Sequence, residues 1–280
     1  MTNQKIGILH PGEMGISIAA SAQNSGNTLY WVSSGRSAAT RARAEKYALQ
    51  DAGTLENLCK QCAAILCVCP PHAAEEMAQQ VVSCGFNGLY LDANAISPRR
   101  VEQIAQAINT SGASFVDGGI IGGPAWKANS TWMYLSGTHA QEAAGIFSAG
   151  PLATHVLGDA VGKASALKMC FAAYSKGTTA LLSTILAAAE FLGVHEDLNR
   201  QWARGNPDFP ANTAERVRGV TAKAWRFSGE MEEIAQTFQD AGLPGGFHQA
   251  AAQIYERIAH FKDASELPPL ENVLDALLSQ

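Results

Sequence analysis

Three residues near the start of the chain have the spacing of a phosphate-binding turn. The apolar run Ile6–Leu9 predicts a buried strand, and His10-x-Gly12-x-x-Gly15 follows it and opens a helix. Backbone N–H groups at such a helix start lack partners and suit a pyrophosphate. The pattern departs from G-x-G-x-x-G at its first position, where this chain has histidine. An ordinary strand-to-helix turn is the alternative interpretation.

The residues of this turn have separable expected roles. Because Pro11 follows His10, we expect His10 in extended geometry, so that the tight turn is made differently from one with glycine there. Gly12 lets the backbone approach a phosphate, and Gly15 lets the helix pack closely against the strand. The turn therefore predicts a dinucleotide site at the carboxyl end of the first strand.

The second predicted strand, Thr28–Val32, indicates which dinucleotide is bound. A site for NAD has an acidic residue at this strand end, which binds the ribose 2′-hydroxyl. Here Ser33-Ser34-Gly35-Arg36-Ser37 follows, and no acidic residue occurs before Glu45. A guanidinium flanked by hydroxyls suits a 2′-phosphate, so the sequence favours NADP. A solvated arginine at a helix start is the alternative for Arg36.

Short apolar runs alternate with helical segments through the first half of the chain. This alternation predicts an α/β fold with an N-terminal Rossmann domain, a doubly wound parallel sheet. The predicted strands are Lys5–Leu9, Thr28–Val32, Ala64–Cys69, Leu89–Ala93, Ser114–Val116 and Thr131–Leu135. The predicted helices are Gly15–Ser25, Ala38–Tyr47, Ala73–Val82, Pro98–Ile108 and Ala140–Phe147.

From Gly162 onward the strand pattern is lost, and an all-α C-terminal domain is predicted. A long interdomain helix over Gly162–Phe191 is apolar on more than one face, which favours burial between domains and against a second subunit. Later helices are predicted at Thr213–Arg226, Glu230–Ala241, Phe247–Phe261 and Pro269–Leu278, with breaks at Asn206-Pro207 and Leu243–Gly246. The domains are expected at 1–160 and 161–280, with the boundary near Leu157–Gly162.

Composition excludes several classes of function. A net charge of −5 argues against a nucleic-acid partner, and the longest uncharged helical run, Gly177–Ala189, is too short to span a bilayer. No secretory leader is expected, because strand-like sequence begins by Lys5. A cytoplasmic protein without a membrane partner is therefore predicted. The six cysteines lack a familiar zinc spacing and are interpreted as reduced thiols, so no metal is expected.

Four blocks, in order, carry a resemblance to a known family. They are the turn ending in Met14-Gly15, the segment Asp92-Ala-Asn94-Ala95-Ile-Ser-Pro98, the segment Asp117-Gly-Gly-Ile-Ile121-Gly122-Gly123, and Gly162-Lys-Ala-Ser-Ala-Leu-Lys168-Met-Cys-Phe171. In this order the chain resembles the β-hydroxyacid dehydrogenases related to 6-phosphogluconate dehydrogenase. It looks closest to a branch whose C-terminal helical domain has no known function. The resemblance covers nearly the whole chain.

The resemblance implies a hydride transfer between NADP and a hydroxyacid or a related alcohol or carbonyl compound. It implies that Lys168 is the general acid/base and that Asn94 lies beside the nicotinamide. Burial among Ala166, Leu167, Met169 and Phe171 is expected to lower the lysine pKa from about 10.4 toward about 7–8. The alternative is an exposed lysine at a helix end, and for Asn94 an Asx turn before Pro98.

The chain also departs from the family. Ile121 replaces the serine of the family's Ser-Gly-Gly substrate loop, and Phe171 with Ala172 replaces its two asparagines. These replacements favour a bulkier or less polar substrate.

The predicted cofactor residues are His10, Pro11, Gly12, Glu13, Met14, Ser33, Ser34, Arg36, Cys69, Pro70, Pro71 and Asn94. The predicted substrate residues are Ile121, Gly122, Gly123, Phe171, Tyr174, Glu230 and His248, with Lys176 as a further candidate.

Other functions stay open at this point. An NADPH-dependent imine or ketone reductase would use a different proton donor, such as Tyr174, and imine reductases usually lack this lysine. A non-catalytic NADP-binding module is a third possibility, which His10, Ile121 and Phe171 keep open.

For Glu230, a surface pair with Arg226 is the alternative to a place in the substrate pocket. A homodimer through the helical domain is expected. Trp225, Phe227 and Phe247 are expected in the core.

Overall fold

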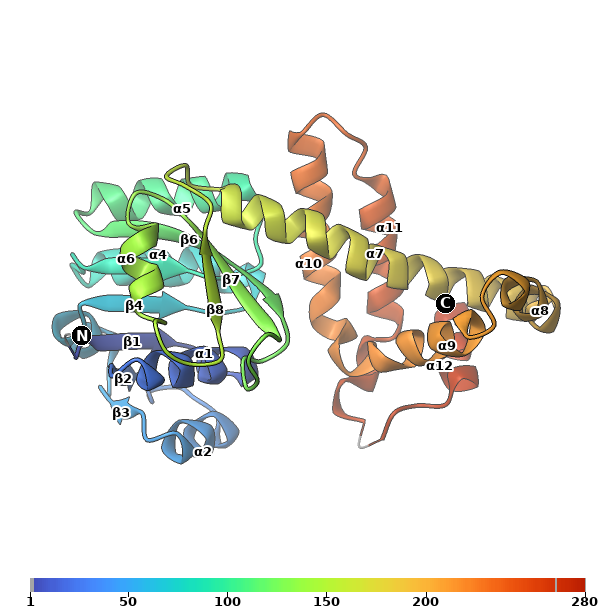
Figure 1. The fold of residues 1–280 in the computed structure, drawn as a ribbon, viewed down its shortest axis with the longest axis horizontal. Coiled ribbons are helices and arrows are strands. Elements are labelled where there is room, and N and C mark those ends of the chain that lie inside the picture. Colours follow the sequence, from blue (N-terminus) through green and yellow to red (C-terminus); the bar gives the residue numbers. More distant parts are fainter. Residues whose placement is uncertain (1–2, 265, 280) are drawn as a thin grey trace. The chain divides into compact units, whose positions relative to one another are not determined.

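The computed structural model describes residues 3–264 and 266–279, which form two compact units (Figure 1). The first unit is Met1–Met169 and the second is Cys170–Gln280. We call them the sheet unit and the helical unit. The predicted functional domains, 1–160 and 161–280, remain a prediction.

The sheet unit alternates strands and helices, as the sequence predicts. Its strands are β1 (Lys5–Leu9), β2 (Thr28–Trp31), β3 (Gln50–Asp51), β4 (Ala64–Cys67), β5 (Leu89–Asp92), β6 (Ser114–Gly122), β7 (Thr131–Ser136) and β8 (Ala153–Val156). Its helices are α1 (Glu13–Asn24), α2 (Ala38–Lys46), α3 (Leu55–Gln61), α4 (Ala74–Ser83), α5 (Pro98–Thr110) and α6 (Ala140–Gly145), with the short 3₁₀ turn η1 (Pro71–Ala73).

The strands form one sheet in the order β3-β2-β1-β4-β5-β6-β7-β8. All neighbouring pairs are parallel except β6 with β7, which are antiparallel. The strand order reverses between β1 and β4, and a doubly wound sheet binds its ligands at the carboxyl ends of the strands beside such a point. The predicted Rossmann fold is confirmed, with an antiparallel strand added.

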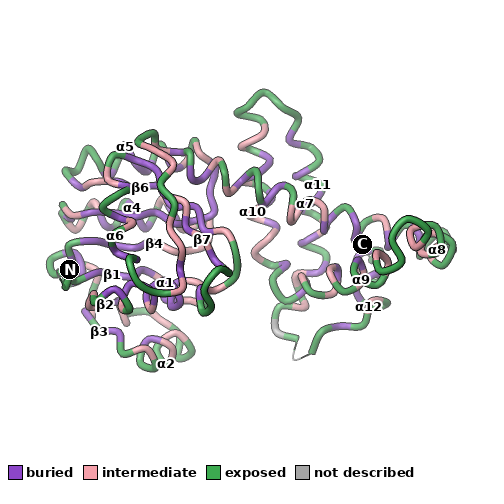
Figure 2. The backbone as a smooth tube through the Cα atoms, in the orientation of Figure 1, coloured by how far each residue is buried: buried purple, intermediate pink, exposed green. Residues whose placement is uncertain are grey.

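The sheet is covered on both faces. One core contains apolar residues of α1 and α6 together with Ile6 and Ile8 of β1. The other contains residues of α3, α4 and α5 with Leu9, Tyr90 and Phe115 from the opposite face of the strands. Figure 2 shows β1, β4 and β6 buried over most of their length. Burial on both faces explains why these strands read as continuous apolar runs.

Several elements of the sheet unit differ from the sequence prediction. β6 extends to Gly122 instead of ending at Val116, because its second half pairs with β7. The residues predicted as a substrate loop therefore lie partly on a strand. β3, α3 and β8 were not predicted. β3 has only two residues, and β8 is a half-exposed edge strand, so neither leaves a periodic apolar signal.

The helical unit contains the rest of α7, which runs from Lys163 to Phe191 and confirms the predicted long helix. The elements that follow are α8 (His195–Gly205), α9 (Phe209–Gly219), η2 (Thr221–Lys223), α10 (Ala224–Asp240), α11 (Gly246–Arg257), η3 (Ala259–Asp263) and α12 (Leu270–Leu278). Both predicted breaks are present, before α9 and before α11. None of these helices within the described residues combines the length and apolarity that crossing a bilayer requires.

Three sequence predictions for the helical unit are wrong. α8 was missed, because its apolar stripe is short, with Leu198 and Trp202 as its large apolar residues, and both are only partly buried. The predicted break between Arg226 and Glu230 is absent, since α10 is continuous and packs along α11, where Ser228 donates to the Glu256 carboxylate at 2.9 Å. Trp225 and Phe247 are exposed rather than in the core.

Candidate functional site

The turn after β1 is made by His10 itself. His10 has φ +62°, and its carbonyl accepts from the Gly12 N–H at 2.7 Å. The prediction of extended geometry for His10 is therefore wrong: the residue adopts the left-handed conformation that usually belongs to glycine. The turn of the glycine motif is kept although the first glycine is missing.

Gly15 is required by this turn. A Cβ added to Gly15 would lie 2.5 Å from the His10 carbonyl oxygen, closer than real contacts allow. At Gly12 the nearest atom would be 4.0 Å away, so the chain itself leaves room there. The two glycines thus have different tasks: Gly15 accommodates the turn, and Gly12 leaves open the surface in front of it.

The start of α1 has no side-chain cap. Its N-cap residue, Gly12, makes no side-chain hydrogen bond, and Glu13 is exposed in the first turn. Arg43 of α2 donates from Nη1 to the Pro11 carbonyl at 3.1 Å and ties α2 to the turn. Such an uncapped helix start is a site for an anion, because its first N–H groups are unpaired and the helix dipole favours negative charge.

Two side chains with unsatisfied polar atoms lie beside the turn. His10 Nδ1 and Arg36 Nε are buried and have no hydrogen-bond partner among the described residues. Burial and the Arg36 charge lower the pKa of His10 from 6.5 to about 4, so the imidazole is neutral at pH 7. Burial lowers the pKa of Arg36, while Cys69 and Cys67 oppose this shift. Because these groups affect one another's pKa, His10, Arg36 and Cys69 lie near one another. They follow strands β1, β2 and β4.

Sequence reasoning missed three residues around the end of β2. Arg41 donates from Nε to the Arg36 carbonyl at 3.3 Å, and Arg43 contacts the turn as described. Asp51, at the end of β3, accepts from the Gly53 N–H at 2.8 Å. Burial tends to raise the Asp51 pKa, but hydrogen bonds from Ser33 and Gly53 outweigh it and the pKa is lowered. The acidic side chain of Asp51 therefore contacts Ser33, although the two residues are distant in the sequence. The predicted cofactor residue Ser34 is exposed.

Asn94 holds the end of β4 in place. Its Oδ1 accepts from the Cys69 N–H at 2.6 Å, and its Nδ2 contacts the Cys67 sulfur at 3.4 Å. Its own N–H donates to Asp92 at 3.0 Å. The Asn94 side chain is buried, and these contacts direct it to the end of β4 rather than to an Asx turn before Pro98. Pro70 and Pro71 follow Cys69 directly, and the 3₁₀ turn η1 begins at Pro71.

The cysteines of the chain are free thiols. Cys67 and Cys69 lie on one side of the strand, as predicted, with their sulfurs 3.8 Å apart. Burial raises the pKa of Cys59 to about 12 and that of Cys62 to about 12, so both are neutral at pH 7. Across residues 3–264 and 266–279, no group of three or more His, Cys, Asp or Glu side chains is placed to hold a metal ion.

The start of α7 is satisfied by a carboxylate of the sheet. Asp117 Oδ2 accepts from the N–H groups of Gly162, Ala164 and Ser165 at 3.0, 3.1 and 3.1 Å, and from the Ser136 hydroxyl at 2.9 Å. Its Oδ1 accepts from the Ser165 hydroxyl at 2.7 Å. Four of these five buried hydrogen bonds join β6 to the start of α7, and the fifth joins β6 to β7.

This cap positions Lys168 over β6. A Cβ on Gly119 would lie 2.5 Å from the Ala164 carbonyl and 3.3 Å from Lys168 Cβ, so only glycine allows α7 this close. The lysine charge acts on Asp92, whose pKa it lowers as a minor contribution. Met169 is buried, but Leu167 and Phe171 are 37% and 48% exposed. The expected apolar burial of the lysine is thus only partial in this unit.

The other predicted residues of the sheet unit lie where β6 ends. Ile121 is partly exposed and Gly123 is exposed. Gly122 has φ +121°, and a Cβ there would lie 2.4 Å from the Ser130 carbonyl oxygen. Thr131 donates to the Gly123 carbonyl at 2.7 Å and closes the connection between β6 and β7.

The predicted substrate residues of the helical unit have mixed surroundings. Tyr174 and Phe171 are exposed. Glu230 Oε2 lies 2.7 Å from Lys176 Nζ, and both side chains are mostly buried. His248 is buried, its Nδ1 has no hydrogen-bond partner among the described residues, and burial lowers its pKa. A Cβ on Gly177 would lie 3.3 Å from Phe247 and 3.8 Å from His248.

The fold and the turn define a dinucleotide-binding α/β protein. The family profile described as the NAD binding domain of 6-phosphogluconate dehydrogenase matches residues 5–148, just over half of the chain. The chain therefore belongs to this family, whose members are nicotinamide-dependent oxidoreductases, as the sequence resemblance predicts. Residues 189–258 match a domain of unknown function, DUF1932, which confirms the predicted branch.

Individual relatives agree with this assignment. The uncharacterized 28.5 kDa protein in 7S RNA 5′ region of Methanothermus fervidus is 29% identical over 164 residues, which are 59% of this chain and 62% of that protein. The chain thus aligns with less than two thirds of that relative. The conserved protein MTH1747, of unknown function and structurally similar to 3-hydroxyacid dehydrogenases, matches with TM-score 0.68 and 26% identity over 92% of this chain and 98% of that one.

A solved enzyme shares the fold at lower identity. The Mycobacterium tuberculosis 3-hydroxyisobutyrate dehydrogenase, solved with L-serine, matches with TM-score 0.71 and 16% identity over 99% of this chain and 100% of that one. At this identity the match concerns the fold alone.

Proposed function

We propose that this protein is an NADP-dependent oxidoreductase that transfers a hydride between the nicotinamide and a hydroxyacid or a related alcohol or carbonyl compound. The observation that carries the proposal is the uncapped start of α1, flanked by the buried, unsatisfied polar atoms of His10 and Arg36. Together they form an anion site at the strand edge where this family binds its cofactor. Residues 1–160 would bind the cofactor, and residues 161–280 would complete the substrate site.

The residues present fit the cofactor. The first turn of α1 and Gly12 would hold the pyrophosphate, and Arg36, with Arg41 and Arg43 nearby, would hold the 2′-phosphate through charge-assisted hydrogen bonds. Cys69, Pro70 and Pro71 would border the cofactor, and Asn94 would keep their loop in place. When bound, the nicotinamide supplies or accepts the hydride.

Lys168 is the proposed general acid/base. In reduction, its ammonium N–H would donate to the carbonyl oxygen, and in oxidation the neutral amine would take the hydroxyl proton. The docking of α7 on Gly119 fixes the helix that carries Lys168, and Ile121 is the last residue but one of the same strand, β6. Because Ile121 and Phe171 replace polar residues of the family, the substrate proposed is bulkier or less polar than a standard small β-hydroxyacid.

The cofactor assignment is tested by titrating the purified protein with NADPH and with NADH while following nicotinamide fluorescence. We expect preferential binding of NADPH, and we expect Arg36→Ala to reduce NADPH affinity at least tenfold with little effect on NADH, because the guanidinium contacts only the 2′-phosphate. Arg200→Ala, at an exposed site of the helical unit, is the charge-matched control. A preference for NADH that Asp51→Asn abolishes would instead assign this strand end to the ribose hydroxyl.

The role of Lys168 is tested by turnover of a panel of ketoacids, ketones and cyclic imines with NADPH. Lys168→Ala should lower turnover by about 10²–10⁴-fold while leaving NADPH affinity nearly unchanged. Unchanged turnover would remove the lysine from the reaction. Turnover of imines alone would favour an imine reductase, and tight NADPH binding without turnover of any substrate would favour a non-catalytic binding module.

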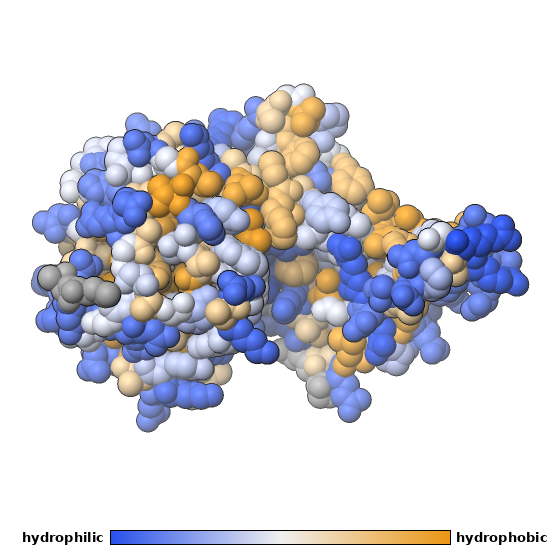
Figure 3. All heavy atoms as spheres, in the orientation of Figure 1, coloured by the Kyte–Doolittle hydropathy of each residue, from blue (hydrophilic) through white to orange (hydrophobic). Residues whose placement is uncertain are grey.

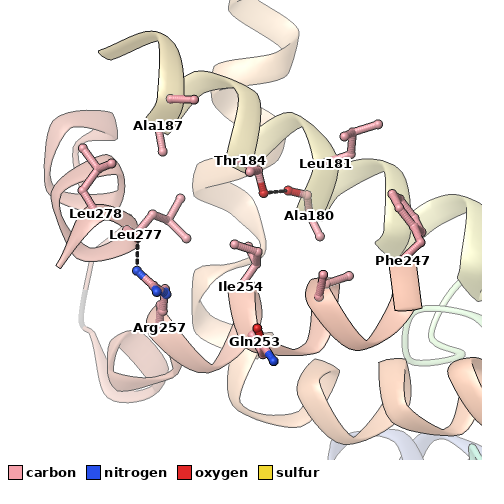
Figure 4. A pocket seen from close by; sticks show the side chains of 13 residues that line it. Ala180, Leu181, Thr184, Ala187, Phe247, Gln253, Ile254, Arg257, Leu277 and Leu278 are labelled. Atoms are coloured by element: carbon pink, nitrogen blue, oxygen red, sulfur yellow. Dashed lines mark hydrogen bonds between the residues drawn. The ribbon is translucent and has the colours of Figure 1, made fainter. Parts of the chain in front are cut away.

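We also propose that the helical unit forms a homodimer. Figure 3 shows apolar side chains on its surface, and Leu181, Phe247 and Leu278 are all more than a third exposed. They border a cavity of about 490 Å³ between α7, α11 and α12 (Figure 4). Arg257 donates to the Leu277 carbonyl at 2.8 Å and tethers α12 at its edge. A second copy covering this apolar surface is supported by its extent, and sedimentation of the wild type and Leu181→Glu tests it.

A further inference from the structure

A row of polar side chains crosses the sheet unit on one face. Cys67, Asp92, Asp117 and Ser136 are direct cross-strand partners on β4, β5, β6 and β7. Because side chains alternate along each strand, they share the face that carries Tyr90. Asp92 and Asp117 are both buried, at 1% and 0% exposure. Two carboxyl groups are therefore neighbours inside the protein.

The two carboxyl groups differ in their partners. Burial raises the pKa of Asp117, but the five hydrogen bonds that it accepts, four of them from the start of α7, oppose this shift by favouring the charged form. Asp92 accepts at Oδ1 from the Asn94 N–H, and its Oδ2 has no hydrogen-bond partner among the described residues. Burial, opposed by the Asn94 hydrogen bonds and reinforced by the Asp117 charge, raises the Asp92 pKa to about 7. Of the pair, Asp92 is the group that holds a proton.

Lys168 lies over the strand that carries Asp117, since its Cβ would be 3.3 Å from a Cβ added to Gly119, two residues further along β6. Its charge acts on Asp92, which pairs with Asp117 across the sheet. The other titratable neighbours of Asp92 are Cys67 and Cys69 on β4 and Tyr90 on β5. The pKa values of Cys69 and Tyr90 are raised, the first by its contact with Cys67 and by burial, the second by burial, so both are neutral. The charges that act on Asp92 are therefore those of Asp117 and Lys168.

We propose that Asp92 is a positioning residue of the reaction, whose own protonation sets how tightly Lys168 holds its proton. This inference rests on the proposed role of Lys168. When Asp92 is ionised it stabilises the ammonium form, and when Asp92 is protonated that stabilisation is lost. The coupling is electrostatic: the charge of each group changes the proton affinity of the other. Asp92 keeps the lysine charged before reduction, and takes up a proton from solvent more readily once the lysine has lost its own.

The experiment reads the lysine directly. The full-length protein is reductively methylated with ¹³C-formaldehyde, and the methyl resonances of its lysines are followed by NMR as a function of pH. Lys168→Arg assigns the resonance that disappears. In the wild type we expect the Lys168 resonance to show an inflection near pH 7, where Asp92 titrates. In Asp92→Asn the inflection should vanish, and the lysine should deprotonate at a lower pH, by a shift equal to the one that Lys168 exerts on Asp92, because the coupling of two charges is reciprocal.

Tyr90→Phe is the matched control, because it removes a buried hydroxyl next to Asp92 without removing a charge, and it should leave the titration unchanged. A wild-type curve without the inflection would overturn the proposal even if Asp92→Asn did not fold, and so would identical curves for the wild type and Asp92→Asn. The pH profile of turnover is an independent readout, in which Asp92→Asn should lose the change near pH 7.

The two proposals fail separately. If Lys168→Ala keeps full turnover but the NMR inflection is present, the catalytic role falls and the electrostatic coupling stands. If Lys168→Ala is inactive and the inflection is absent, the lysine keeps its catalytic role and Asp92 has no part in tuning it.

Discussion

Helices α1 and α7 both begin in the sheet unit, and they differ in what meets their first N–H groups. At α1 the N-cap is Gly12, which offers no side chain, and the only acidic residue of the first turn is exposed. At α7 the Asp117 carboxylate, from a neighbouring strand, accepts three backbone N–H groups and two hydroxyls. One helix start has a built-in anion and the other has none.

This difference separates a helix start that the protein itself satisfies from one that we propose binds the cofactor. Both ends present the same backbone donors and the same positive end of the helix dipole. At α7 the protein uses them to join the long helix to the sheet and to fix Lys168 above Gly119. At α1 the same groups are available for a phosphate. Mutations at the two sites should therefore affect different properties.

The largest effect is expected at α7. Asp117→Ala removes five buried hydrogen bonds and should lower the free energy of unfolding by about 3–5 kcal/mol, measured by urea denaturation. Glu13→Ala, at the exposed first turn of α1, is the control and should change it by less than about 1 kcal/mol. Equal losses at the two positions would mean that the two helix starts do not differ as their hydrogen bonds indicate.

An intermediate effect is expected at the glycines of α1, where stability and cofactor binding can be separated. Gly15→Ala forces a Cβ to 2.5 Å from the His10 carbonyl and should reduce both thermal stability and NADPH affinity. Gly12→Ala meets nothing in the protein closer than 4.0 Å, so it should keep the stability and lower the affinity at least tenfold. If Gly12→Ala bound NADPH normally, the pyrophosphate would not approach this helix start.

The smallest effect is expected at His10. His10→Gly relieves the strain of a residue with a Cβ in the left-handed conformation, and should raise the free energy of unfolding by about 1 kcal/mol. The burial that lowers the His10 pKa to about 4 makes the folded state bind fewer protons than the unfolded state between pH 4 and 6.5. Since His10 costs stability there, the gain from His10→Gly should grow as the pH falls through this range.

His10→Ala separates the two causes in the same unfolding measurements. It removes the imidazole but keeps a Cβ at φ +62°, so it should reproduce the pH-dependent part of the gain and not the conformational part. A loss of stability in His10→Gly would show that packing of the imidazole outweighs the strain.

Local sequence predicted the parts of the molecule that depend on local patterns. The strands β1, β2, β4 and β5 and the long helix α7 were predicted because each has an apolar pattern of its own. The elements that were missed have only a short pattern, since α8 has two large apolar residues, Leu198 and Trp202, and β3 has two residues in all. The break predicted near Gly229 is absent because packing of α10 on α11 overrides the low helix propensity of glycine.

By itself the sequence determined the fold class, the phosphate turn and the position of the lysine in the chain, because these follow from patterns over a few neighbouring residues. Only the tertiary structure decided that His10 takes a left-handed conformation, that Asp51 reaches Ser33, and that Asn94 holds Cys69. It alone brought Asp117 to the start of α7 and Asp92 beside it. The reason is physical: strand register places residues that are distant in the sequence side by side, and no local pattern records that register.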